Sequence, residues 1–167
     1  MALGVVLVLG TVAEVAGVLT GFPFGRYAYT TRWWPVVSLP DGHWFPLQVP
    51  FAWFLVVGAS LLAVSRLGQG RLGKGSVLLT GALAATIDLI MEPVMTGPLG
   101  YWRWLDAGPL PGGAPIANFL GWFATAAVAA LALNAFGAAQ AWRAWEPTAV
   151  LVGHVALVLG IGAIHAF

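Results

Sequence analysis

The sequence contains no cysteine, and few of its 167 residues are charged. Without cysteine, the chain cannot form disulfides, use a catalytic thiolate, or ligate zinc or iron–sulfur clusters through sulfur. Charged residues make up 8% of the chain, against about 25% in a typical soluble domain, whereas hydrophobic residues make up 60%. This composition indicates an integral membrane protein.

Basic residues and nucleotide-binding motifs are scarce or absent as well. Seven basic and six acidic residues leave a net charge of +1, so no polybasic face exists for nucleic acid. The chain has no Gly-rich phosphate loop, no dinucleotide fingerprint and no Gly-x-Ser-x-Gly elbow, and we expect no cofactor. The histidines, among them His43 and His165, show no spaced ligand motif, and we expect no metal site.

Long apolar segments dominate what is present. A helix needs about 20 mostly apolar residues to cross a bilayer, and five segments approach that length. We therefore expect an all-α fold, a single domain over residues 1–167 in the form of a transmembrane bundle of about five helices. The five predicted spans are Ala2–Thr20, Pro50–Ser65, Gly75–Met95, Asn118–Gln140 and Pro147–Phe167.

Two long, aromatic-rich connections, 21–49 and 96–117, separate the first span from the second and the third from the fourth. With five alternating spans, both connections lie on one side of the membrane, and the short turns lie on the other. The short-turn side carries four basic residues and the long-connection side carries three, which weakly favours short turns that face the cytoplasm.

Three acids fall inside predicted spans: Glu14 in the first, and Asp88 and Glu92 in the third. A charge inside a bilayer is costly, so such residues usually mark function. Asp88 and Glu92 are four residues apart and share one helical face. Two close carboxyls in a low dielectric do not both ionise easily, so one is expected to keep its proton near neutral pH, as a general acid must. In the alternative interpretation, the acids pair with Arg26 or Arg103 and only hold helices together.

Aromatic residues collect on the long-connection side of the membrane, where the buried acids also lie. Seven of the nine tryptophans fall there, among them Trp102, Trp104 and Trp122. An interfacial aromatic belt would decorate both sides. The one-sided excess favours a pocket for a long apolar ligand, in which ring faces stabilise a cation. Acids beside such a pocket suggest a reaction that begins when an alkene is protonated to a carbocation.

Several separated motifs resemble the carotenoid 1',2'-hydratase family, and they extend from the first predicted span to the fourth. The matching strings are Glu14-x-x-Gly17, the run Thr20-Gly-Phe-Pro-Phe-Gly-Arg-Tyr-Ala-Tyr29, Asp88-x-x-x-Glu92-Pro93, Trp102-x-Trp104 and Pro115-x-x-Asn118-Phe119-x-Gly121-Trp122. Where the family carries Asp-Pro, this chain has Glu92-Pro93, which keeps the carboxyl and lengthens its reach. The resemblance implies a prokaryotic inner-membrane enzyme that adds water to the terminal ψ-end double bond of an acyclic or monocyclic carotenoid such as lycopene or γ-carotene.

Together these observations predict a site without cofactor or metal, whose partners are the carotenoid, water and the lipid bilayer. Asp88 is the preferred proton donor, and the attacking water is held by Glu92, Glu14 or Asn118. Family members are longer, so the resemblance also implies a homo-oligomer in which a partner protomer completes the bundle. The residues expected to bind or enclose the substrate are Arg26, Tyr27, Trp102, Trp104, Asn118, Phe119 and Trp122.

Two other functions remain open at this stage. A small membrane lycopene cyclase would begin with the same protonation but capture the cation with an internal double bond. A carotenoid-binding or proton-coupled transport protein would use the acids as a relay, although no acid lies in the short-turn half of the spans to continue one.

Overall fold

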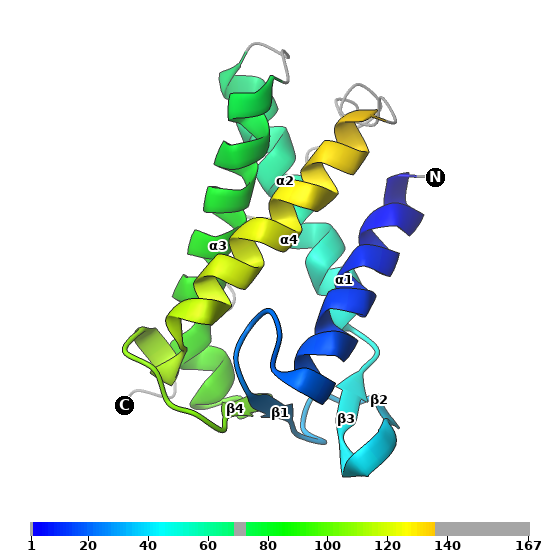
Figure 1. Ribbon diagram of the computed structural model, residues 1–167, viewed down its shortest axis with the longest axis vertical. Helices are drawn as coiled ribbons and strands as arrows, with labels where there is room; N and C mark the ends of the chain where they lie inside the picture. The colour runs from blue at the N-terminus through cyan, green and yellow to red at the C-terminus, as the bar shows by residue number, and fades with distance from the viewer. Residues whose placement is uncertain (1, 69–72, 136–167) are drawn as a thin grey trace.

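The computed structural model describes residues 2–68 and 73–135 of the chain. Four helices run roughly lengthwise through the molecule, and the two long connections lie together at one end (Figure 1). The helices are α1 (Ala2–Thr20), α2 (Val49–Leu67), α3 (Lys74–Thr96) and α4 (Ile116–Ala135).

The helix bounds agree with the first four predicted spans to within two residues wherever the structure describes them. Three helices, α2, α3 and α4, are long and apolar enough to cross a membrane, and α1 is a shorter apolar helix over Gly4–Thr20. The fifth predicted span, Pro147–Phe167, and the end of the fourth lie outside the described residues. The chain is thus a helical membrane protein, as its composition indicated.

The long connections contain short strands and turns, which the sequence analysis did not anticipate within an all-α fold. Each strand has three residues and each pair forms an antiparallel two-stranded sheet: β1 with β4, and β2 with β3. The strands are β1 (Tyr27–Tyr29), β2 (Val36–Ser38), β3 (Trp44–Pro46) and β4 (Trp102–Trp104), and the 3-10 turns are η1 (Pro40–Gly42) and η2 (Pro111–Gly113).

The pairing of β1 with β4 joins the two long connections directly. Tyr27 lies opposite Trp104, and Tyr29 lies opposite Trp102. This register confirms that both connections occupy the same side of the bundle. Figure 1 shows the β1–β4 ribbon at the end of the bundle where the two connections lie.

Candidate active site

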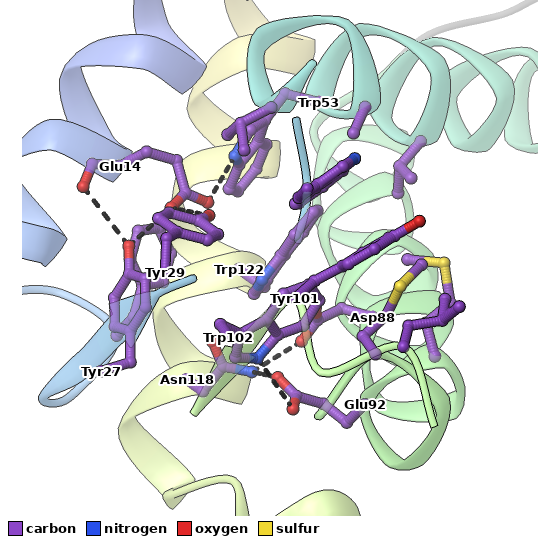
Figure 2. A pocket seen from close by; sticks show the side chains of 18 of the residues that line it. Glu14, Tyr27, Tyr29, Trp53, Asp88, Glu92, Tyr101, Trp102, Asn118 and Trp122 are labelled. Carbon is purple, nitrogen blue, oxygen red and sulfur yellow. Dashed lines mark hydrogen bonds between the residues drawn. The ribbon is translucent and has the colours of Figure 1, made fainter. Parts of the chain in front are cut away.

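A pocket of about 230 Å³ opens where the helix ends meet the β1–β4 ribbon (Figure 2). All four helices and both long connections contribute side chains to it. The lining residues are Glu14, Phe24, Tyr27, Tyr29, Trp33, Val49, Ala52, Trp53, Val56, Asp88, Met91, Glu92, Met95, Leu99, Tyr101, Trp102, Trp104, Asn118 and Trp122.

Helical periodicity explains which side chains of α2 and α3 reach the pocket. On each helix the lining residues occupy positions i, i+3, i+4 and i+7, which form one stripe on a helix surface. On α3 this stripe includes both predicted acids. The stripes are Val49, Ala52, Trp53 and Val56 on α2, and Asp88, Met91, Glu92 and Met95 on α3.

Asn118 of α4 joins the two acids of α3. Its Nδ2 donates to Asp88 Oδ2 at 2.6 Å and to Glu92 Oε1 at 3.1 Å. The other carboxylate oxygen of Glu92 accepts from Trp104 Nε1 at 3.0 Å and Trp102 Nε1 at 3.3 Å. Glu92 therefore faces three N–H groups that can only donate, whereas Asn118 is the one hydrogen-bond partner that Asp88 has within the described residues.

Glu14 of α1 accepts hydrogen bonds from a second group of donors that line the same pocket. Tyr27 and Tyr29 donate their hydroxyls to Glu14 Oε2 at 2.6 and 2.7 Å, and Trp53 Nε1 donates to Oε1 at 2.8 Å. Only about 5% of Glu14 is exposed, so these donors replace the water that the carboxyl loses.

The two tyrosines are fixed as donors by their surroundings. Burial, and next the charge of the neighbouring Glu14 carboxylate, raise the pKa of Tyr27 and of Tyr29 well above the ordinary value for a phenol. Both hydroxyls therefore keep their protons throughout the physiological pH range, and both can donate to Glu14.

Stacked aromatic rings enclose the acids. Trp53 and Trp122 stack with ring centroids 3.8 Å apart and planes 12° apart, and Trp33 and Tyr101 stack at 5.0 Å and 7°. Figure 2 shows the Trp122, Tyr101 and Trp102 rings between the Glu14 cluster and the Asp88–Glu92 pair. Ring faces of this kind attract a cation in a site that admits little water.

Most of the predicted site residues meet in this pocket. Glu14, Asp88 and Glu92 all line it, and so do five of the seven residues expected to bind or enclose the substrate. These five are Tyr27, Trp102, Trp104, Asn118 and Trp122.

The other two, Arg26 and Phe119, lie outside the lining. Phe119 is half-buried and packs against the hydrophobic core. Arg26 is exposed, and its Nε donates to Asp106 Oδ2 at 2.7 Å. The Arg26 guanidinium lowers the pKa of Asp106. Because Arg26 precedes β1 and Asp106 follows β4, this ion pair links the start of β1 to the end of β4. The alternative in which Arg26 pairs with a buried acid does not occur.

The sequence analysis missed Tyr29 and Trp53 as partners of Glu14. A signal for each was present. Tyr27 and Tyr29 alternate around Ala28, as Trp102 and Trp104 alternate around Arg103, and side chains two apart in a strand share a face. Trp53 lies on the i, i+3, i+4, i+7 stripe of α2.

The polar groups that line the pocket are carboxyls, hydroxyls, the Asn118 amide and ring N–H groups. Among residues 2–68 and 73–135, no three His, Asp or Glu side chains form a group that could hold a metal ion. None of the described residues that line the pocket is Lys, Arg or His, so nothing in the lining favours an anionic ligand such as a diphosphate.

The fold and the site define an integral membrane protein with a buried acidic pocket walled by aromatic rings. Over residues 1–167 the chain matches the carotenoid biosynthesis protein family, and it belongs to that family. It is 33% identical over 121 residues to the bisanhydrobacterioruberin hydratase of Haloarcula japonica, a match that covers 71% of this chain and 39% of the relative. No solved structure matches the chain.

Proposed function

We propose that this protein is a carotenoid 1',2'-hydratase, which adds water to the terminal ψ-end double bond of an acyclic or monocyclic carotenoid without a cofactor. The observation that carries the proposal is the convergence of Asp88, Glu92 and Glu14 on one aromatic-walled pocket without a cationic side chain in its described lining. Such a pocket suits a neutral polyene and the carbocation formed from it. Similarity to a relative named as a hydratase supports the same reaction class.

In the proposed mechanism, Asp88 is the general acid. Within the described residues its carboxyl accepts a single hydrogen bond, from Asn118 to Oδ2, so its second oxygen is available to carry a proton toward the substrate. Transfer of that proton to the less substituted carbon of the double bond places the positive charge on the tertiary carbon. Trp122 and Trp104, which line the pocket, stabilise this cation through their ring faces.

Glu92 is the proposed base. Three N–H donors hold its carboxylate beside Asp88, and Asn118 contacts both acids through one nitrogen. A water molecule held by Glu92 attacks the tertiary carbon and forms a C–O bond, and its proton passes to the carboxylate pair. The double bond is consumed, a tertiary alcohol is formed, and the acid pair ends with the proton it began with.

Glu14 is the third proposed catalytic acid. As a carboxylate within its own set of donors, it places negative charge on the opposite wall of the pocket from α3 and so lowers the energy of the developing cation. The proposal places the enzyme in a prokaryotic inner membrane, as a homo-oligomer.

The test is to express the chain in a bacterium that accumulates lycopene and to analyse the extracted pigments by chromatography with mass detection. A product heavier by one water supports the proposal. A product of unchanged mass with altered retention indicates cyclisation and contradicts it. If lycopene is unchanged, the same assay is repeated in a strain that accumulates γ-carotene. The absence of a hydrated product from both strains contradicts the hydratase proposal.

A further inference from the structure

The pocket has an acidic part and an apolar part. The apolar part is formed by side chains of α2, of α3 and of the residues that follow α3. None of them is charged or able to form a hydrogen bond through N or O. They are Val49, Ala52, Val56, Met91, Met95 and Leu99.

Helical spacing separates the two parts on α3. Asp88 and Glu92 form one row and Met91 and Met95 form a second, displaced by three residues, or about 60° around the helix axis. Asn118 of α4 binds the acid row. The methionine row is therefore a separate wall beside the acids, and unbranched methionine side chains adapt to ligands of irregular shape.

The side chains of the apolar part differ in exposure. Val49 and Val56 are buried, as are both methionines, whereas Ala52 and Leu99 are partly exposed. Ala52 also carries the smallest side chain in the lining. It lies in the first turn of α2, and Leu99 lies three residues beyond the end of α3, so each adjoins a helix end that joins one of the long connections.

The size of the pocket requires that most of a carotenoid lies outside it. At about 230 Å³ it is smaller than the roughly 300–1,000 Å³ of pockets that enclose a drug-sized ligand. A carotenoid is far longer than such a ligand, so only its end group fits beside the acids. The rest of the polyene must leave through an uncharged wall.

We propose that the pocket opens to the bilayer between Ala52 and Leu99, and that this opening is the polyene subsite, through which the chain of the carotenoid extends from the acids into the bilayer. This inference rests on the proposed function for the identity of its ligand. It assigns Met91 and Met95 to the wall along which the first conjugated units lie, and it makes Ala52 the residue that limits the width of the passage.

The test replaces Ala52 with phenylalanine, which fills the passage with a ring. The matched control is Ala124→Phe, because Ala124 is exposed on α4 and lies outside the pocket lining. Each variant is purified from lycopene- and γ-carotene-accumulating cells, and two quantities are measured: carotenoid retained per mole of folded protein, and hydrated product formed. We expect Ala52→Phe to lower both by at least about ten-fold and Ala124→Phe to change neither appreciably.

Retention and product formation separate this inference from the proposed function. If the unmodified protein retains carotenoid but forms no hydrated product, the hydratase proposal fails, and the loss of retention in Ala52→Phe still supports the subsite. If Ala52→Phe retains carotenoid as well as Ala124→Phe does, or if the unmodified protein retains none, the subsite is overturned.

A second measurement guards against misfolding of the phenylalanine variant. Since the chain has no cysteine, Ala52→Cys and Ala124→Cys each introduce a single thiol. Bound carotenoid is expected to slow maleimide labelling of Ala52→Cys several-fold and to leave Ala124→Cys unaffected. Equal labelling of Ala52→Cys with and without carotenoid, or failure of that thiol to react at all without carotenoid, contradicts an open passage at this position.

Discussion

Asp88 differs from the other two acids of the pocket in the number of donors that surround it. Within the described residues, one N–H contacts Asp88, whereas three donors contact Glu92 and three contact Glu14 through their side-chain oxygens. A carboxyl with few donors is suited to give a proton, and one with several is suited to remain an anion. This difference supports the assignment of Asp88 as acid and Glu92 as base.

We predict that Asp88→Asn abolishes hydration while the protein remains folded. The amide keeps an oxygen that can accept from Asn118, but it has no acidic proton, so turnover should fall by at least about 100-fold. Turnover is measured from the hydrated product, and folding from the elution of the purified protein. Asp41→Asn is the matched control, because Asp41 is an exposed aspartate outside the pocket lining and should leave turnover unchanged. Retained turnover in Asp88→Asn would remove Asp88 from the acid role.

At Glu14, stability and charge can be separated by two substitutions. Glu14→Leu leaves the Trp53 N–H and the Tyr29 hydroxyl without their acceptor, and a buried unsatisfied donor costs about 1–3 kcal/mol. The Tyr27 hydroxyl loses the carboxylate but keeps the main-chain carbonyl oxygen of residue 14 at 3.3 Å. Glu14→Gln can present its carbonyl to Trp53 and its NH₂ to the tyrosine oxygens. We expect Glu14→Leu to unfold at clearly lower denaturant than Glu14→Gln in detergent solution. Equal midpoints would show that these hydrogen bonds do not stabilise the fold.

The elements of the site were predictable to different degrees. The apolar runs predict the helices to within a residue or two, because a bilayer-crossing helix needs a long uncharged segment. The placement of Asp88 and Glu92 on one face follows from their spacing. The partners of Glu14 were not foreseen, because Tyr27 and Tyr29 belong to β1, a three-residue strand whose partner β4 lies about 75 positions further along the chain. Three-residue strands leave little signal in a sequence.

A close approach between α1 and the first connection brings Tyr27 to Glu14. A Cβ at Gly17 would lie 2.7 Å from Phe24 Cδ2 and 2.8 Å from the Tyr27 hydroxyl oxygen, both too short for an ordinary contact. Glycine at this position therefore permits the hydrogen bond from Tyr27 to Glu14.

We predict that Gly17→Ala destabilises the protein by about 1–3 kcal/mol through overpacking, despite the better helix propensity of alanine. Gly4→Ala is the control on the same helix, because its added Cβ would meet nothing within 4 Å. Thermal unfolding in detergent compares the two, and Gly4→Ala should match or slightly exceed the unmodified protein. If the two variants unfold alike, the contact with Tyr27 does not limit the packing of α1.

At the scale of the whole molecule, the two long connections form one layer at one end of the bundle (Figure 1). The basic residues of the short turns favour a cytoplasmic location for the opposite end. With that orientation, the pocket opens toward the non-cytoplasmic half of the membrane. Homo-oligomer formation stays a prediction at this scale.

Single cysteines test this topology, since the chain has none of its own. Asp41→Cys and Ala107→Cys introduce exposed thiols in the two long connections, and Leu67→Cys introduces one at the end of α2, at the short-turn end. A membrane-impermeant maleimide added to spheroplasts should label the first two and should label Leu67→Cys only after lysis. Labelling of Asp41→Cys and Ala107→Cys from opposite sides would contradict the pairing of β1 with β4. Labelling of only Leu67→Cys in intact spheroplasts would reverse the orientation.

The β1–β4 ribbon also constrains the order in which the parts of the folded molecule can assemble during synthesis. Its first strand leaves the ribosome before α2, and its second strand follows α3, so the first waits outside the bilayer while two further helices are inserted. During that interval Glu14 gains the Trp53 donor only once α2 is in place, and Glu92 lacks both tryptophans until β4 is made. The pocket therefore closes late in biogenesis, and a chain arrested before β4 carries all three acids without a site.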